Sequence, residues 1–149
     1  MHEHQQPSDL APYGPLALEV VRSAARLTRA ASKIPGITHS SIAWRVLADL
    51  ERDGATRVTD LAAAQRVAQP TMTTLVQRLA GETWVGRTAD PADGRATLVA
   101  ITESGARALA AYREGAANLI APALAELDPA DRAALARAAE LMHRIADTV

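Results

Sequence analysis

The clearest pattern of hydrophobic and polar positions lies between residues 69 and 79. Apolar residues recur there at the i, i+3, i+4 and i+7 spacing of a helix that buries one side: Met72, Leu75, Val76 and Leu79. The rest of this helix carries small hydrogen-bonding side chains and one arginine, without a carboxylate. Amides and hydroxyls can read base edges in a major groove, and arginine can reach guanine or phosphate. The pattern therefore predicts a helix whose outer face suits DNA.

A shorter helix and a turn precede this segment. Thr59, followed by Asp60 in the first turn, is predicted to cap a helix over the apolar run that begins at Leu61. Residues 66–68 then form a turn. Pro70 stands in the first turn of the second helix, where its missing N–H costs nothing. This spacing predicts a helix-turn-helix.

Two short runs rich in β-branched residues follow, at residues 83–88 and 96–101. Between them lies the turn-forming sequence Asp-Pro-Ala-Asp-Gly-Arg, residues 90–95. The runs predict a β-hairpin beside the two helices, with Arg95 near its tip. Together these elements predict a winged helix-turn-helix.

These residues resemble the MarR family of bacterial transcription regulators. The resemblance covers about a third of the chain, and its most specific part is the wing motif Asp-Pro-x-Asp-x-Arg, a strand, and Ile-Thr-Glu-x-Gly, which runs from Asp90 to Gly105. The segments 60–62, 69–73, 75–76 and 78–79 and Arg87 also match in order and spacing. The resemblance implies a homodimer that binds a palindromic operator. For many members it also implies release from DNA by a small, often phenolic or aromatic, ligand.

We therefore expect a sequence-specific DNA-binding regulator, a repressor, that requires no cofactor. In the family pattern the wing arginine, here Arg95, reaches the minor groove and the nearby aspartate, here Asp93, holds it. The side chains expected at the DNA are Gln69, Thr71, Thr73, Thr74, Gln77, Arg78, Asp93 and Arg95.

Three positions depart from the family pattern. Thr83 replaces the glycine that usually follows the recognition helix, and Gly81 is expected to supply the left-handed exit two residues earlier. Ala68 replaces the usual serine N-cap, a change that costs about 1 kcal/mol. Gly94 stands where a further arginine is common, so the wing has one phosphate contact fewer.

Amphipathic helices flank the central unit. The first is predicted over residues 16–33, and the second over residues 38–53, with Thr38, Ser40 and Ser41 as equally plausible caps. A long helix capped by Thr102 should run to about residue 127, with a kink at Pro122. A last helix should begin after residue 128, because Asp-Pro-Ala-Asp supplies an N-cap, a proline and an acid in the right order.

The apolar stripes of the first and last helices exceed what the central unit can cover. This favours a dimer interface over an intramolecular helical bundle. The predicted fold class is mainly α with a small β-wing. Its organisation is an arm at 1–15 and a single domain at 16–149, with a winged helix at 38–102 and dimerisation helices at 16–33 and 103–149.

A ligand pocket is a further expectation. Trp44 projects about 130° from the apolar stripe of its helix, so it must pack on a second body or line a cavity. The simpler alternative is a tryptophan covered by a neighbouring helix. A cavity between the first helix, the Trp44 helix and the Tyr112 helix could hold a small aromatic acid, with Arg22 or Arg26 pairing with its carboxylate. His39 is a further candidate for this pocket, although a lone histidine at a helix start is more often a surface residue.

Composition narrows the choices. A chain of 149 residues with 48% hydrophobic and 22% charged residues suits one folded domain. The absence of cysteine excludes disulfides and a cysteine redox switch, and it fits a cytoplasmic protein. No apolar run approaches the roughly 20 residues of a membrane span, so no membrane partner is expected.

The net charge of −1 argues against a generally basic surface. The segment 58–102 has four arginines and four acidic residues, so its net charge is zero. The arginines are Arg66, Arg78, Arg87 and Arg95, and the acids are Asp60, Glu82, Asp90 and Asp93. DNA affinity should then rest on a few placed arginines, with a moderate dependence on salt.

Two other classes of function fit less well. An enzyme is not expected, because the chain has no nucleophile elbow, phosphate loop or HExxH pattern and its four histidines are scattered. His2 and His4 flank Glu3, but no second cluster completes a metal site. The alternative function is a winged helix that binds a protein instead of DNA. It would carry apolar residues on the outer face of the 69–79 helix, where this chain has threonine, glutamine and arginine.

Overall fold

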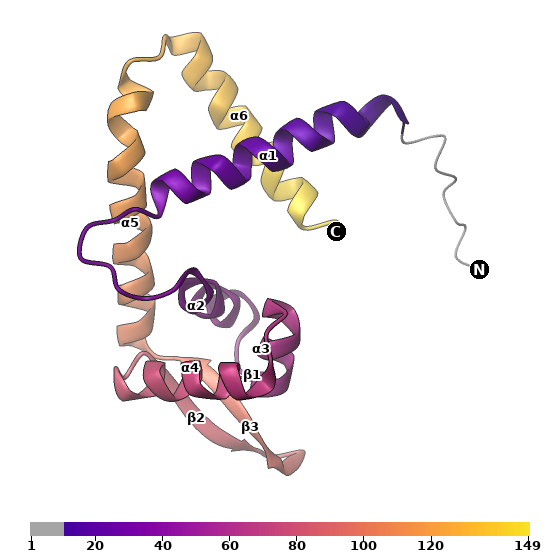
Figure 1. Ribbon diagram of the computed structural model, residues 1–149, viewed down its shortest axis with the longest axis vertical. Coiled ribbons are helices and arrows are strands. Elements are labelled where there is room, and N and C mark those ends of the chain that lie inside the picture. The colour runs from indigo at the N-terminus through magenta and orange to yellow at the C-terminus, as the bar shows by residue number, and fades with distance from the viewer. Residues whose placement is uncertain (1–10) are drawn as a thin grey trace.

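The computed structural model describes residues 11–149. Within them, helices α2, α3 and α4 cover one side of a three-stranded sheet, and α5 rises from the sheet before α6 turns back (Figure 1). The predicted mainly α fold with a small β-wing is confirmed. In chain order the elements are a short 3-10 helix Ala11–Tyr13, α1 Gly14–Ala31, α2 Ser41–Asp53, β1 Thr56–Arg57, α3 Val58–Gln65, α4 Gln69–Gly81, β2 Val85–Asp90, β3 Asp93–Ile101, α5 Glu103–Ala125 and α6 Pro129–Ala146.

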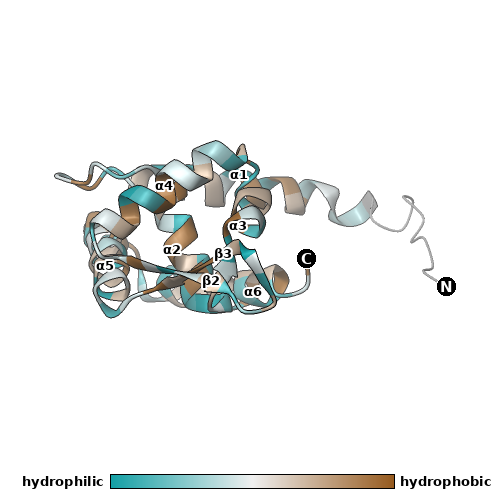
Figure 2. Cartoon of the chain, turned by 90° about the horizontal axis from the view of Figure 1, so that it is seen from below, coloured by the Kyte–Doolittle hydropathy of each residue, from teal (hydrophilic) through white to brown (hydrophobic). Residues whose placement is uncertain are grey.

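The core lies between α2, α3, α4 and the sheet. The predicted stripes of α2 and α4 are confirmed, and the hydropathy colouring shows their apolar sides turned inward (Figure 2). Val99 of β3 and Leu109 of α5 complete this core. Burial of these aliphatic side chains fixes the height and tilt of α4 against the sheet. The fully buried residues of α2 and α4 are Ala43, Val46, Leu47, Leu50, Met72, Val76 and Leu79.

Side-chain caps define three of the helix starts. Ser40 caps α2, where its Oγ accepts from the Ala43 N–H at 3.3 Å. Of the three candidate caps Thr38, Ser40 and Ser41, the structure therefore selects Ser40. The predicted caps Thr102 and Asp128 are confirmed, with bonds of 3.1 and 2.8 Å from Gly105 and Asp131. The predicted Thr59 cap is wrong. Helix α3 already begins at Val58, because β1 delivers the chain directly into its first turn.

The sheet contains a strand that the sequence pattern did not predict. The two residues of β1 pair antiparallel with Val99 and Leu98 of β3, which gives the strand order β1-β3-β2. The wing strands are shifted from their predicted bounds, since β2 begins at Val85 and β3 at Asp93. The turn at the wing tip is therefore shorter than predicted, with only Pro91 and Ala92 between the strands.

The exit of α4 differs from the expectation for Gly81, which stays within the helix. The left-handed residue is Thr83, with φ of 63°. Thr83 N donates to Ala80 O at 3.0 Å and Trp84 N to Leu79 O at 2.9 Å, the paired bonds of a Schellman motif. That motif requires the left-handed conformation at Thr83 whatever residue is there. A β-branched residue in this conformation is strained, by about 1–3 kcal/mol.

Because Gly105 has no side chain, the start of α5 can lie against the backbone of Trp84, where the chain enters the wing. The Thr102 N–H donates to Trp84 O at 3.0 Å, and a Cβ added at Gly105 would overlap that same carbonyl group. We expect Gly105→Ala to lower the free energy of unfolding by about 2–3 kcal/mol, since backbone must move to admit the methyl group. Denaturant titration measures this loss. The control Gly86→Ala places its methyl group in open space and should change the value by less than about 0.5 kcal/mol.

Helices α1 and α6 are not packed into the core. Helix α1 begins at Gly14 rather than at residue 16, so the predicted arm is helical in its last five residues and its first ten lie outside the described chain. The two helices cross in projection in Figure 1, but Figure 2 shows them on opposite sides of the molecule. Neither has a fully buried residue in the described chain, and Leu16 and Ile145 are 67% and 57% exposed. Among residues 11–149, no helix has the length and apolar character needed to cross a membrane.

Candidate nucleic-acid interface

The outer face of α4 is polar and accessible. Every residue predicted to contact DNA from this helix is exposed: Gln69, Thr71, Thr73, Thr74, Gln77 and Arg78. The Thr73 and Thr74 hydroxyls donate to the Gln69 and Pro70 carbonyls, each at 3.0 Å. These bonds use the hydroxyl protons within the helix. The face therefore presents hydroxyl acceptors and methyl groups, together with the free amides of Gln69 and Gln77.

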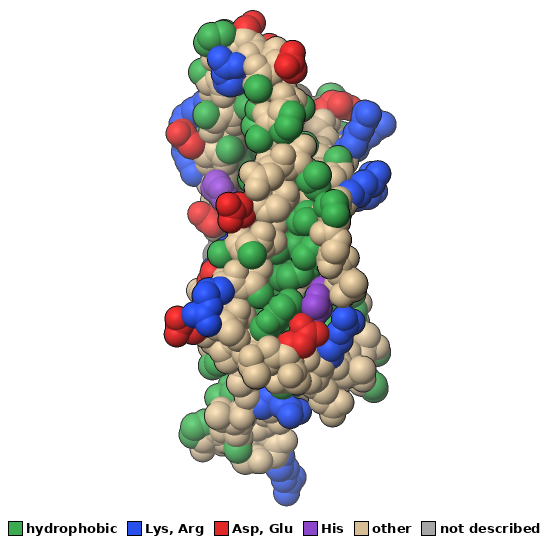
Figure 3. Space-filling view, turned by 90° about the vertical axis from the view of Figure 1, so that its left-hand side faces the viewer, with side chains coloured by type: hydrophobic (Ala, Val, Ile, Leu, Met, Phe, Trp, Pro, Cys, Tyr) green, Lys and Arg blue, Asp and Glu red, His purple; other side chains and the backbone are tan. Residues whose placement is uncertain are grey.

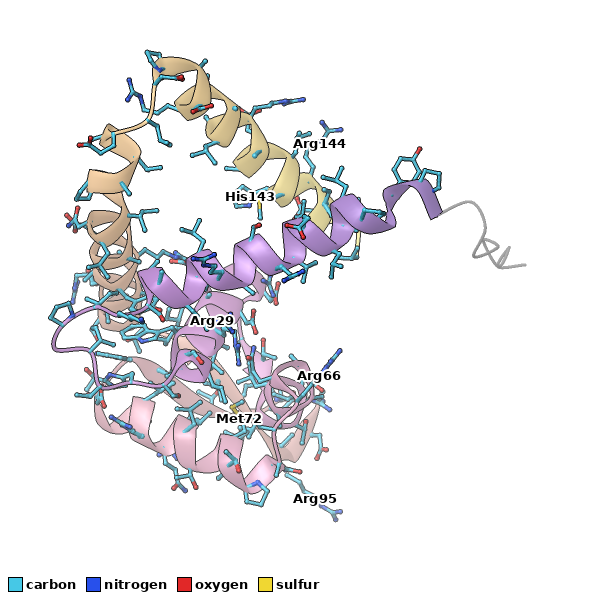
Figure 4. All side chains as sticks on the ribbon, turned by 45° about the horizontal axis from the view of Figure 1, so that its top comes forward. Arg29, Arg66, Met72, Arg95, His143 and Arg144 are labelled. Atoms are coloured by element: carbon cyan, nitrogen blue, oxygen red, sulfur yellow. The ribbon has the colours of Figure 1, made fainter. Side chains whose placement is uncertain are left out.

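The turn between α3 and α4 holds the second helix at a fixed angle. Arg66 ends α3 in the left-handed conformation, with φ of 54°, and Val67 N donates back to Ala62 O at 3.0 Å. Ala68 occupies the N-cap of α4 without a side-chain bond, as predicted. The first N–H groups of α4 are consequently left without a side-chain cap at the surface. Arg66 points away from the body beside this turn (Figure 4).

The wing carries Arg95 beyond the rest of the protein. Its side chain projects from the end of the molecule near the start of α4 (Figure 4). Asp93 Oδ1 accepts from the Arg95 backbone N–H at 3.1 Å. This bond orients the backbone of the wing, whereas the family resemblance implies that the aspartate holds the guanidinium.

An ion pair with a buried carboxylate ties the tip of the wing to β1. Asp90 is 7% exposed, and its Oδ2 accepts from Arg57 Nε at 2.6 Å while its Oδ1 accepts from the Ala92 N–H at 2.9 Å. The hydrogen bond from Ala92, with the Arg57 guanidinium, outweighs burial and lowers the pKa of Asp90 from its ordinary value. Arg57 was not among the predicted site residues, because it lies 33 residues from Asp90.

The lowered pKa of Asp90 makes the wing sensitive to acid. A carboxylate with a lower pKa in the folded state stabilises that state above its unfolded pKa, near 3.9, and this contribution disappears as the pH falls through the folded value. We expect Asp90→Asn to melt below the parent protein at pH 7, with a difference that shrinks below about pH 4. Thermal melts between pH 3 and 7 measure this. A constant difference across that range would contradict the assigned role of the charge.

A groove separates α4 from the wing. Its volume is about 370 Å³, and both Gln69 and Thr73 of α4 line it. Arginines 57, 87 and 95 line the same groove, against the single carboxylate of Asp93. Arg87 matches the family pattern but was not among the residues predicted to contact DNA. Because Arg57 is already paired with Asp90, it is Arg87 and Arg95 that favour an anionic occupant of this groove.

Arg78 lies at the end of α4 within a small ionic cluster. Its Nε is 3.5 Å from Glu82 Oε1, and Glu82 Oε2 is 2.7 Å from His39 Nε2. His39 does not line the pocket between α1, α2 and α5, because its ring turns toward Glu82 and lies against Trp84. It is also largely buried, unlike a surface histidine.

A pocket does exist between α1, α2 and α5, where one was predicted. Trp44 stacks on Tyr112, with ring centroids 4.2 Å apart, so it is both covered by α5 and part of the pocket wall. The volume is about 360 Å³. Hydrophobic side chains run along this face of the molecule between α5 and its neighbours (Figure 3). The pocket is lined by Thr28, Arg29, Ser32, Ser41, Trp44, Arg45, Ala48, Leu109, Tyr112 and Arg113.

The predicted arginine partners for this pocket were one to two helical turns out of place. Arg22 and Arg26 do not line it, and Arg22 lies 3.7 Å from Glu19 on the surface of α1. Arg29 takes their position and faces α2 (Figure 4). Helix periodicity placed the arginines on the correct element, but it could not show where α1 crosses α2.

Comparison with known proteins agrees with this geometry. The MarR family model matches residues 40–97. An HTH-type transcriptional regulator of Mycobacterium bovis is 38% identical over 101 residues, which cover 68% of this chain and 71% of the relative. A regulator of Mycobacterium leprae is 34% identical over the same shares.

Solved structures share the fold. A transcriptional regulator of Thermotoga maritima superimposes with a TM-score of 0.72 at 21% identity, over 90% of this chain and 95% of that one. Apo MarR of E. coli gives a TM-score of 0.71 at 19% identity, over 86% and 96%. BpsR of Bordetella bronchiseptica, whose DNA binding is regulated by 6-hydroxynicotinic acid, gives 0.55 at 24% identity, over 96% of both chains. With its polar α4 face, its wing and these relatives, the chain belongs to the MarR family of winged helix-turn-helix, DNA-binding transcription regulators.

Proposed function

We propose that this protein is a repressor that binds a palindromic operator as a homodimer. The observation that carries the proposal is the pairing of an exposed hydrogen-bonding face on α4 with Arg95 at the tip of the wing. In this arrangement α4 lies in a major groove and Arg95 enters the adjacent minor groove. Gln69, Thr73 and Gln77 then face base edges.

The groove between α4 and the wing suits the DNA strand that separates those two grooves of the duplex. A phosphodiester strand must cross the protein there if the helix and the wing occupy neighbouring grooves. Arg87 and Arg95 supply the positive charge that this strand requires. Asp90 does not oppose it, because Arg57 already balances that carboxylate.

The dimer rests on the exposed apolar faces of α1 and α6. A second copy is the economical partner for these faces, since a two-fold dimer buries the same residues twice and places two α4 helices on one side of a duplex. Two half-sites would be about 34–36 Å apart. The large exposed residues on the two helices are Leu16, Leu18, Val21, Leu27, Leu135, Leu141, Met142 and Ile145.

Selection of bound fragments from the genome of the source organism tests the operator. The expected result is a two-fold symmetric sequence near a promoter, followed by loss of transcription in vitro when the protein is added. An asymmetric site, or higher transcription with the protein bound, would contradict the proposal. A protein-binding winged helix is the weaker alternative, because it requires apolar residues on the outer face of α4.

A small aromatic acid is the proposed releasing ligand. The pocket of about 360 Å³ accommodates one substituted ring, with Trp44 and Tyr112 as stacking partners. Among residues 11–149, Arg29 forms no ion pair, and the buried Trp44 Nε1 has no hydrogen-bond acceptor. A carboxylate could satisfy such groups. By analogy with the regulation of BpsR, 6-hydroxynicotinic acid is a reasonable first probe.

We expect millimolar 6-hydroxynicotinate or benzoate to weaken operator binding and to raise the melting temperature. Neutral benzamide should do neither, because it lacks the carboxylate that Arg29 would bind. Arg29→Gln should reduce the response by about five- to tenfold, whereas the control Arg22→Gln should leave it unchanged. Fluorescence anisotropy with labelled operator measures the effect. Equal responses of the two variants would remove Arg29 from the site.

A further inference from the structure

The Glu82 carboxylate, just beyond α4, lies between a histidine and an arginine. His39 Nε2 is 2.9 Å from Glu82 Oε1 and 2.7 Å from Oε2. Because an ionised carboxylate only accepts hydrogen bonds, Nε2 must carry the proton and donate it. Arg78 Nε is farther away, at 3.5 Å from Oε1. The carboxylate is therefore engaged more closely by the imidazole than by the guanidinium.

The position of His39 is set by aromatic rings. Its ring centroid lies 4.6 Å from that of Trp84 and 5.5 Å from that of Trp44, and its side chain is only 12% exposed. Glu82 faces the ring directly, and Arg78 faces it through Glu82. His39 is thus a donor held in one place, while Arg78 at 52% exposure is free to move.

We propose that His39 is a positioning residue of the DNA interface, which holds Glu82 away from Arg78 so that the guanidinium stays available for DNA. Without this donor, the carboxylate would turn to Arg78 and form a closer ion pair.

This inference rests on the proposed contact of Arg78 with DNA, and variants at three positions test it. His39→Leu removes the donor and should weaken DNA binding by roughly two- to fivefold, the range expected for a partly exposed ion pair. In a Glu82→Gln background, the same substitution should have no effect, because no carboxylate competes for Arg78. His39→Gln keeps an N–H donor. It should recover most of the affinity lost in His39→Leu.

Rescue by His39→Gln separates this role from a structural one, because this variant restores the donor without restoring the ring. Anisotropy titrations at constant salt, on variants whose melting temperatures have been measured, supply the comparisons. If His39→Leu fails to fold, His39→Phe keeps an aromatic ring without a donor and supplies the same comparison in the parent and Glu82→Gln backgrounds.

Two outcomes would overturn the inference. One is an equal loss of affinity from His39→Leu in the parent and Glu82→Gln backgrounds. The other is a failure of His39→Gln to recover the affinity that His39→Leu loses. Arg78→Ala distinguishes failure of this inference from failure of the interface. If Arg78→Ala binds DNA like the parent, the placement of α4 is at fault. If it binds more weakly while His39→Leu does not, only the role of His39 is wrong.

Discussion

Arg95→Ala is expected to weaken binding to all operators alike, by about 1–3 kcal/mol. The side chain extends past the wing and would enter a minor groove, where narrow width and negative potential attract a guanidinium. Such a contact reads groove shape more than base identity. The loss should therefore be similar for strong and weak sites, and the melting temperature should not change, because Arg95 is exposed.

Salt titrations with the same variant test the charge assignment. The parent dimer should neutralise about four to eight phosphates, and Arg95→Ala should lower the slope of log affinity against log salt by about one for each arginine removed. Arg137→Ala is the control, since it removes an exposed arginine from α6, far from the wing. Parent-like binding by Arg95→Ala would refute the wing contact.

The double substitution Leu16→Glu and Ile145→Glu is expected to produce a folded monomer whose operator affinity is at least about a hundredfold lower. Both side chains are more than half exposed in the single chain, so the charges do not disturb its core. They would disrupt an interface formed by α1 and α6. A monomer then binds one half-site and loses the gain from linking two, which is of order 10²–10⁴.

Light scattering at micromolar concentration measures the assembly, and anisotropy measures the affinity. Ile37→Glu is a suitable control, because it charges an exposed apolar residue in the loop between α1 and α2. If the double variant remains a dimer, the interface lies elsewhere. If it is a monomer with parent affinity, DNA binding does not require the dimer.

Much of the fold could be predicted because its signals are local. The apolar spacing within α4 identified Met72, Val76 and Leu79 as buried, and each is. The caps at Thr102 and Asp128 depend on hydrogen bonds between residues three positions apart, so the local sequence was enough to predict them. The Asp-Pro-x-Asp-x-Arg motif located the wing for the same reason.

The remaining features depend on distant contacts. Strand β1 has two residues and exists because Val99 and Leu98 pair with it, more than 40 positions later. The pairs that join Arg57 to Asp90 and His39 to Glu82 likewise span 33 and 43 residues. Neither has a spacing that a single sequence could reveal. Residues of the candidate DNA face were easier to assign, because one helix carries most of them.

The most direct test of the central claim, that α4 reads bases as part of a dimer, is a comparison of the sequences selected by the parent and by Gln77→Ala. Gln77 is exposed on the outer face of α4 and belongs to no apolar stripe, so the variant should fold normally. A bidentate amide contact contributes about 1–3 kcal/mol to discrimination at one base pair. The account predicts that the variant relaxes the preference at one symmetric pair of operator positions and leaves the others unchanged. An unchanged sequence preference, or a change that is not repeated in the two half-sites, would contradict it.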